Sequence, residues 1–195
     1  MPAGLLLAAG AGRRMGGPKA LVQLDGRPLV LRAVDVLRAA GCAPVVVVVG
    51  AAADEVRTLL PADVTAVEAV GWADGMGASL RAGLAALEPL AGVDTAIVHL
   101  VDLPGVTAAA VARLADAADD APAALARAAY DGRAGHPVLL GRDHWAAVSA
   151  SATGDAGARG YLAGNSDVAL VECGDVAEPD DVDTPEQLAR RDPTR

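Results

Sequence analysis

The segment at residues 5–19 reads LLLAAGAGRRMGGPK, a short apolar run followed by a glycine-rich loop. The apolar run at residues 5–9 is predicted to be a strand. Glycine lets the backbone adopt positive φ and approach a ligand closely, and the exposed amides of such a loop form a concave anion site. Arg13, Arg14 and Lys19 add positive charge suited to phosphate. The segment therefore predicts a loop that holds a polyphosphate.

Two familiar glycine loops do not fit this segment. A P-loop needs Ser or Thr after its Gly-Lys pair, whereas Lys19 lies between Pro18 and Ala20. The dinucleotide fingerprint needs a third glycine for close helix–strand packing, and Met15 stands at that place. A glycine-rich turn with solvent-exposed arginines is the structural alternative. It is disfavoured because the crowded cations repel one another unless an anion joins them.

Length and charge limit the class of protein. The chain has 195 residues, and at that size a folded chain buries roughly 70% of its unfolded surface, so we expect a single domain over residues 1–195. The net charge of −9 argues against a nucleic-acid partner. Two distant cysteines suggest buried thiols in a reducing cytoplasm. Residues 5–9 are too short for a leader or a membrane span, so we expect a cytoplasmic location.

Strand and helix patterns alternate along most of the chain. This order predicts an α/β, Rossmann-like fold with a mostly parallel central sheet and helices on both faces. Asp131-Gly132 is a turn signal between two late strands, which are expected to form a hairpin. The predicted strands span residues 5–9, 45–49, 64–69, 95–101, 124–130, 136–140 and 168–172; the predicted helices span 28–40, 54–60, 78–87, 107–118, 143–149, 157–163 and a segment from 184.

Two aspartates follow patterns that suit a metal site. Asp102 comes directly after an apolar strand and before Leu103-Pro104, and ligands of open α/β sheets lie beyond the carboxyl ends of the strands. Asp183 precedes a capping box with proline at the first helical position, residues 184–187. Each also has a structural alternative, since Asp is common in turns and at helix N-termini.

Four blocks of the chain together resemble one family. The first, LAAGAGRRMGGPK at residues 7–19, resembles the signature of the MobA-like nucleotidyltransferases. The segments at residues 72–83 (WADGMGASLRAG), 102–104 (DLP) and 181–188 (DVDTPEQL) follow in family order. The chain is most similar to the molybdenum cofactor cytidylyltransferase (MocA-like) branch. This resemblance implies transfer of CMP from CTP to the phosphate of molybdenum-molybdopterin, with release of pyrophosphate.

The resemblance also implies roles for individual residues. Ser79 has a second interpretation as a helix cap, His136 as a structural histidine, and Asp155 as a cap at Ala156. Mg²⁺ is the implied cofactor, with Asp181 as the alternative to Asp183. The implied catalytic residues are Arg14, Lys19 and Asp102; the nucleotide-binding residues are Leu7, Ala8, Ala9, Gly10, Gly12, Arg14, Lys19, Gly75 and Ser79; the acceptor-binding residues are His136, Asp155 and Arg159; the metal ligands are Asp102 and Asp183.

The nucleotide and the acceptor stay open at this point. Ala9 stands where the guanylyltransferases of the family commonly have glycine, which favours the smaller base of CTP. Transfer from GTP or another NTP to molybdopterin, a phosphosugar or a phospholactate is the enzymatic alternative. A non-catalytic carrier that delivers the cofactor to a molybdoenzyme is the alternative of another class. A molybdoenzyme that receives the product is a further implied partner.

Overall fold

A seven-stranded sheet forms the centre of the computed structural model, which describes residues 1–119 and 121–191. Its strand order is β5-β4-β1-β6-β8-β7-β9, and β2 and β3 form a separate hairpin. Strands β1 and β4 are buried at every position, and β6 is buried at every position except its last, Leu100. Their mostly apolar sequences are typical of strands that are covered on both faces. The strands are β1 (Ala3–Leu7), β2 (Gln23–Leu24), β3 (Arg27–Pro28), β4 (Val45–Val49), β5 (Thr65–Glu68), β6 (Thr95–Leu100), β7 (Leu125–Tyr130), β8 (Arg133–Gly141) and β9 (Ala169–Glu172).

The sheet is mostly parallel, as predicted. Neighbours β5, β4, β1 and β6 pair in parallel, and so do β7 and β9. Strand β8 is antiparallel to both of its neighbours, β6 and β7. The predicted hairpin joins β7 to β8 through Asp131 (φ 51°) and Gly132 (φ 74°), the left-handed conformation that such a tight turn requires.

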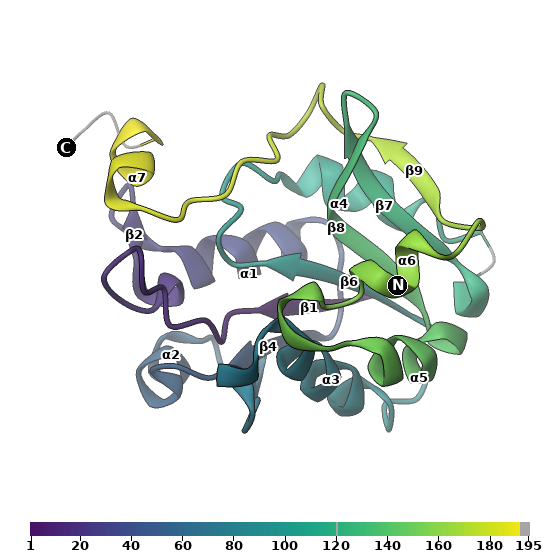
Figure 1. Cartoon of the computed structure of the whole chain (residues 1–195), viewed down its shortest axis with the longest axis horizontal. Coiled ribbons are helices and arrows are strands. Elements are labelled where there is room, and N and C mark those ends of the chain that lie inside the picture. Colours follow the sequence, from purple (N-terminus) through teal and green to yellow (C-terminus); the bar gives the residue numbers. More distant parts are fainter. Residues whose placement is uncertain (120, 192–195) are drawn as a thin grey trace.

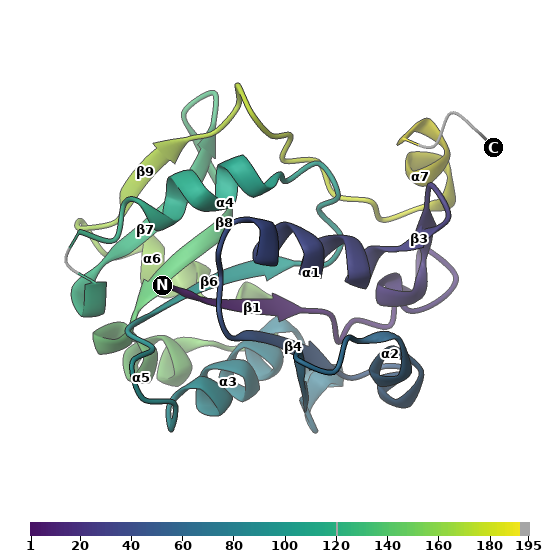
Figure 2. The ribbon, with the colours of Figure 1, turned by 180° about the vertical axis from the view of Figure 1, so that it is seen from behind.

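Helices cover both faces of the sheet (Figures 1 and 2). One apolar cluster packs α1, α2 and α4 against one face, and a second packs α3, α5 and α6 against the other. These two clusters confirm the predicted α/β fold with helices on both faces. The helices are α1 (Leu29–Ala39), α2 (Ala53–Leu59), α3 (Met76–Leu87), α4 (Ala108–Ala115), α5 (Arg142–Ser151), α6 (Arg159–Ala163) and α7 (Pro185–Arg191), with short 3-10 helices at Lys19–Leu21, Trp72–Asp74, Ala121–Ala123 and Gly154–Ala156.

Several predicted bounds differ from the structure, and one hairpin was not predicted. Strand β8 begins at Arg133 and not at residue 136, and α4 ends at Ala115 and not at residue 118. The first strand is Ala3–Leu7 and not residues 5–9, so Ala8 and Ala9 belong to the loop. The hairpin of β2 and β3 was not expected from the sequence. Its turn, Asp25-Gly26, has positive φ at both residues, and an Asp-Gly pair is a recognised hairpin signal. The strands are only two residues long, too short for a clear alternation of apolar and polar residues.

The C-terminal segment returns to the carboxyl edge of the sheet. After β9 it runs across the molecule to α7, which lies beside the β2–β3 hairpin (Figures 1 and 2). On the way the Val182 amide donates to the Asp102 carbonyl oxygen at 2.9 Å. The predicted capping box is present, because the Gln187 side chain accepts from the Asp183 and Thr184 amides. These bonds place residues 181–183 directly beside the loop that follows β6.

Among the described residues, no helix combines the length and the apolar character that a membrane crossing requires.

Candidate active site

Two cavities open at the carboxyl edge of the sheet and meet at Asp102. The glycine-loop cavity, about 400 Å³, is bounded by the loop after β1 and by the segment that leads into α3. The β8 cavity, about 570 Å³, is bounded by β6, β8 and α6. Both are large enough for a small-molecule ligand. The residues that line both cavities are Leu7, Met76, Leu100, Asp102 and Asp155.

The glycine loop holds its shape through backbone contacts. The Gly12 carbonyl oxygen accepts from the Met15 amide at 2.9 Å and from the Gly17 amide at 3.3 Å. Gly12 has φ 57°, and a Cβ there would lie 2.0 Å from the Gly17 carbonyl oxygen. Only glycine fits this position without moving the loop. These contacts fold the loop back at Gly12, and its residues 9–14 line the glycine-loop cavity.

Lys19 is the fixed cation of the loop. Its ammonium group pairs with Asp102 at 2.6 Å and also with Asp183. Burial disfavours the charged amine, but the carboxylates of Asp102 and Asp183 outweigh it and raise the pKa of Lys19. The Arg14 guanidinium pairs with the other Asp183 oxygen at 2.5 Å while remaining 74% exposed, against 15% for Lys19. Lys19 is thus anchored, and Arg14 extends into solvent at the mouth.

Three carboxylates gather where the cavities meet. Asp102, Asp181 and Asp183 each offer an oxygen atom, and these atoms all lie within 4.8 Å of one another. Burial and the neighbouring charges of Asp183 and Asp102 raise the pKa of Asp181. Hydrogen bonding from Lys19 lowers the pKa of Asp183. Such a cluster of hard oxygen donors suits Mg²⁺ or Mn²⁺, so the residues present fit a divalent metal.

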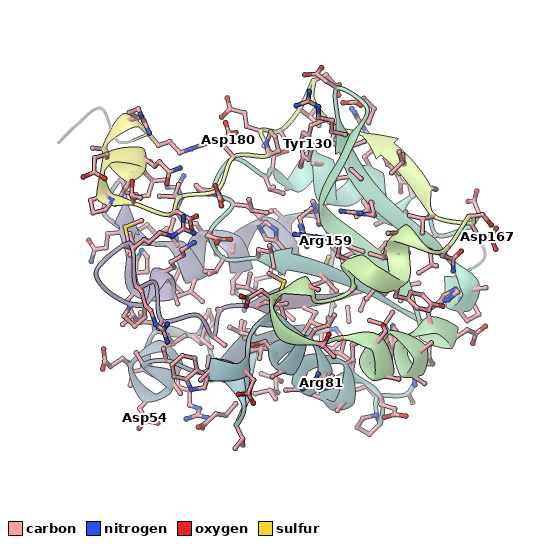
Figure 3. All side chains as sticks on the ribbon, in the orientation of Figure 1. Asp54, Arg81, Tyr130, Arg159, Asp167 and Asp180 are labelled. Atoms are coloured by element: carbon pink, nitrogen blue, oxygen red, sulfur yellow. The ribbon has the colours of Figure 1, made fainter. Side chains whose placement is uncertain are left out.

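The β8 cavity carries two cations of its own. Arg127 on β7 and Arg159 on α6 both line it, and Figure 3 shows Arg159 extending from α6 over the sheet. Neither forms an ion pair with any residue in the described ranges 1–119 and 121–191. The buried Arg127 Nε also has no hydrogen-bond partner there. Burial, together with the charge of Arg159, lowers the pKa of Arg127.

His136 also lines the β8 cavity. Burial, followed by the charges of Arg127 and Arg159, lowers its pKa to about 4. The imidazole is therefore neutral near pH 7 and can donate or accept a hydrogen bond. Two guanidinium groups without an ion pair among the described residues, together with a neutral histidine, give this part of the wall a chemistry that suits an anion or a strongly polar group.

The structure brings most of the predicted site residues to the two cavities. Ala8 and Ser79 are different: both are buried, and neither lines a cavity. The Ala8 methyl group packs in the core on the α1 face. Helix α3 begins at Met76 with Gly75 as its N-cap, so Ser79 lies inside the first turn and the helix-cap interpretation is wrong. Leu7, Ala9, Gly10, Gly12, Arg14, Lys19, Gly75, Asp102, Asp155 and Asp183 line the glycine-loop cavity, and His136 and Arg159 line the β8 cavity.

Among the wall residues that were not singled out from the sequence, Trp72 and Arg127 have side chains that could act on a ligand. Trp72 lines the glycine-loop cavity. Its segment, residues 72–83, belongs to the family resemblance, but no role was predicted for the Trp72 side chain. Arg127 is the only charged residue of β7, which is otherwise buried. A single arginine within an apolar strand is a usable signal, because burying a charge is costly unless a partner compensates it.

Comparison with known proteins agrees with this geometry. Residues 4–170 match the family model described as the MobA-like NTP transferase domain. The match ends before Asp181 and Asp183, so their place beside Asp102 comes from the structure. A curated relative, nicotine blue oxidoreductase of Paenarthrobacter nicotinovorans, is 39% identical over 96% of this chain and 94% of its own.

Solved structures share the fold over nearly the whole chain. Rv0371C of Mycobacterium tuberculosis H37Rv, solved in complex with manganese, is 26% identical with a TM-score of 0.77, covering 99% of this chain and 98% of that one. A nucleotidyl transferase of Methanothermobacter thermautotroptrophicus is 24% identical with a TM-score of 0.82, covering 99% and 96%. At that identity the second likeness shows the fold alone.

The family match covers most of the chain, and the first motif block lies within it, in the loop that walls the glycine-loop cavity. The chain therefore belongs to the MobA-like NTP transferase family.

Proposed function

We propose that this chain, as one catalytic domain over residues 1–195, is a metal-dependent cytidylyltransferase. It transfers CMP from CTP to the phosphate of a molybdopterin-type acceptor and releases pyrophosphate. The observation that carries the proposal is the junction of two cavities at Asp102: one is walled by the glycine loop and Lys19, the other by Arg127, Arg159 and His136. Such a pair of sites suits a donor nucleotide and an anionic acceptor that meet beside the carboxylates.

The reaction is a displacement at the α-phosphorus of the nucleotide. An oxygen of the acceptor phosphate forms a new bond to that phosphorus, and the bond to the β-phosphate oxygen breaks, so that pyrophosphate leaves. Lys19 and Arg14 stabilise the charge on the phosphoryl oxygens and the departing pyrophosphate. Positioning of the two substrates supplies much of the remaining rate.

Asp102, Asp181 and Asp183 would hold the divalent metal. A bound Mg²⁺ or Mn²⁺ would neutralise phosphate charge and stabilise the displacement. Support comes from the carboxylate cluster itself and from the manganese complex of the related Rv0371C structure. Mg²⁺ is the ion we propose for this chain, because few carboxylates plus substrate phosphates is its usual coordination.

The acceptor-side cations give a prediction for substrate affinity. Arg127→Gln removes a charge that no other described residue neutralises, and the kcat/KM for the acceptor is expected to fall roughly 10- to 150-fold. The effect is expected mainly in the KM of the acceptor, with the KM of the nucleotide nearly unchanged. Steady-state kinetics with each substrate varied in turn measure this split.

Arg133→Gln is the matched control, since Arg133 is exposed on the same hairpin and lies outside both cavities. Its kinetics should equal those of the unaltered enzyme. Equal loss in the two variants, or a change confined to the nucleotide KM, would remove Arg127 from the acceptor site.

The expected preference for CTP over GTP is based on the close packing of the cavity wall beside Ala9. A Cβ at Gly50 would lie 2.8 Å from the Ala9 Cβ and 2.5 Å from the Trp72 Cγ, so Ala9, Gly50 and Trp72 pack closely. We expect CTP to be preferred over GTP by roughly 10- to 200-fold, the range that one methyl group can supply. Ala9→Gly should reduce the preference without abolishing transfer. Competition assays with the two nucleotides measure it.

Ala8→Gly is the control for loss of a methyl group, because Ala8 faces the α1 side of the sheet. It should leave the nucleotide ratio unchanged. Equal use of CTP and GTP by the unaltered enzyme would refute the cytidylyltransferase assignment and leave transfer of another nucleotide to molybdopterin, a phosphosugar or a phospholactate.

Two further functions remain in competition. The curated relative that covers most of the chain is named an oxidoreductase, so a redox activity is a second candidate. A carrier that delivers the cofactor to a molybdoenzyme is a third. Pyrophosphate release, assayed across nucleotides with and without molybdenum cofactor, separates them. Reduction of nicotine blue by a reduced nicotinamide cofactor, without release of pyrophosphate, would favour the redox function. Binding of the molybdenum cofactor with neither activity would favour the carrier.

A further inference from the structure

Two of the three clustered carboxylates lie on a segment without regular secondary structure. Asp181 and Asp183 belong to residues 178–183, which form no helix or strand and lead into α7. We name these residues the carboxylate strap. Figures 1 and 2 show this part of the chain crossing from β9 to α7. The place of the two carboxylates beside Asp102 therefore depends on the contacts that hold the strap.

Backbone hydrogen bonds fix the strap at two points. The Glu178 amide donates to the Gly105 carbonyl oxygen at 3.1 Å, and the Val182 amide donates to the Asp102 carbonyl oxygen at 2.9 Å. The Val182 side chain is fully buried in the apolar cluster on the α1 face. Between these two points, the described part of the chain contains no backbone–backbone hydrogen bond to residues 179–181. The middle of the strap is therefore held by other contacts.

Arg191, at the end of α7, supplies such a contact. Its Nη1 atom lies 3.2 Å from Glu178 Oε2, and its Nη2 atom lies 3.5 Å from Asp180 Oδ2. Figure 3 shows Asp180 on the strap, and the next residue is Asp181. One guanidinium group therefore bridges the first backbone anchor and the residue that adjoins Asp181.

Gly105 allows Arg191 and the strap to pack closely. A Cβ at Gly105 would lie 2.9 Å from Glu178 Cβ and 3.1 Å from Arg191 Nη1. Gly105 belongs to the same loop as Asp102, three residues after it. The Asp102 loop, the start of the strap and the end of α7 therefore meet at one point.

Asp183 is held by a different contact, at the other end of the strap. The Gln187 side chain accepts a hydrogen bond from the Asp183 amide at 2.7 Å. This bond belongs to the first turn of α7, whereas Arg191 is the last described residue of that helix. The Arg191 bridge is therefore expected to act on Asp181 and not on Asp183.

We propose that Arg191 is a positioning residue for the metal site: its bridge between Glu178 and Asp180 holds Asp181 within the carboxylate cluster. The inference rests on the metal site of the proposed function. The two partner carboxylates are 70% and 77% exposed, and exposed ion pairs contribute little to the stability of a fold. The bridge is therefore expected to affect the geometry of the cluster more than the unfolding of the protein.

Arg191→Gln tests the bridge through Mn²⁺ binding to the full chain without nucleotide, followed by the electron paramagnetic resonance signal of the free ion. The Kd for Mn²⁺ should rise roughly two- to fivefold, the range that exposed ion pairs supply. The sign of the change is informative, because loss of a positive charge near a cation site would by itself tighten binding. Arg190→Gln is the matched control: it makes the same charge change at the neighbouring residue of α7, which is exposed and outside the bridge. It should leave the Kd unchanged or lower it slightly.

Further variants identify the carboxylate on which Arg191 acts. In an Asp181→Asn background, Arg191→Gln should cause no further change, whereas in an Asp183→Asn background it should raise the Kd by the same factor as in the unaltered protein. Arg191→Lys should give an intermediate Kd, since a compact ammonium group pairs with one carboxylate and lacks the fork that bridges two. Thermal unfolding checks that each variant is folded.

Three results would each overturn the inference alone: an unchanged or lowered Kd in Arg191→Gln, an equal rise in Arg190→Gln, or a rise that persists in the Asp181→Asn background. Failure of the unaltered protein to bind Mn²⁺ would refute the metal site of the proposed function, and this inference with it.

Discussion

Replacing Asp102 by Asn is expected to slow pyrophosphate release roughly 100- to 1,000-fold, the cost of removing one preorganised charge from a transferase site. Asn keeps the shape of the side chain and removes the charge. Asp102 lies where the two cavities meet and shares its cluster with Asp181 and Asp183. No other described residue occupies this central place in both walls and the carboxylate cluster. Initial rates of pyrophosphate release at saturating CTP and Mg²⁺ measure the loss.

Binding of Mn²⁺, followed by the signal of the free ion in electron paramagnetic resonance, gives an independent measure. It should weaken in Asp102→Asn and in Asp183→Asn. Asp94→Asn is the matched control, since Asp94 is exposed just before β6 and outside both cavities. Full activity of Asp102→Asn at ordinary Mg²⁺ would end its assignment as a metal ligand. An unchanged Asp183→Asn would move the second ligand to Asp181, which the geometry allows.

The layered fold was predictable because each element carries its own signal. Val45–Val49 is apolar at every position and was predicted with its correct ends, as expected for a strand that is covered on both faces. The hairpin of β7 and β8 followed from Asp131-Gly132. The end of β1 was missed by two residues. Ala8 and Ala9 continue the apolar run, and only the pairing with β4 and β6 determines where the strand stops.

The candidate site was predictable where its residues adjoin a strand end or a glycine loop. Asp102 and Lys19 are of this kind, and the structure brings them into contact across 83 positions of sequence. Arg127 was not predicted because its proposed role depends on two cations that meet in one cavity without an ion pair to any described residue. The second cation, Arg159, lies on α6, about 30 residues after Arg127 in the sequence. Ser79 shows the reverse: its segment resembles a nucleotide-binding motif, but the turn of α3 buries the side chain.

Replacing Lys19 by Ala is expected to reduce kcat/KM for the nucleotide by roughly 100-fold or more, since it removes a fixed positive charge from the glycine loop, which we propose holds the nucleotide phosphates. Lys19 is held by Asp102 and Asp183 and is only 15% exposed. Arg14 is 74% exposed, and Asp183 is its one ion-pair partner among the described residues, so Arg14→Ala is expected to reduce kcat/KM less. Arg13 is exposed and in the variable position of the motif, and Arg13→Ala should change the rate least.

The metal assay separates a phosphate-binding role of Lys19 from damage to the carboxylate cluster. The Lys19 ammonium pairs with Asp102 and Asp183, the carboxylates that would hold the metal, so Lys19 and the metal compete for the same oxygens. Lys19→Ala should therefore keep or tighten Mn²⁺ binding while transfer is lost, whereas Asp102→Asn should lose both. Loss of Mn²⁺ binding in Lys19→Ala would mean that Lys19 holds the cluster together and does not act on phosphate. If Arg13→Ala reduces the rate more than Arg14→Ala and Lys19→Ala do, the register assigned to the glycine loop is wrong by one residue.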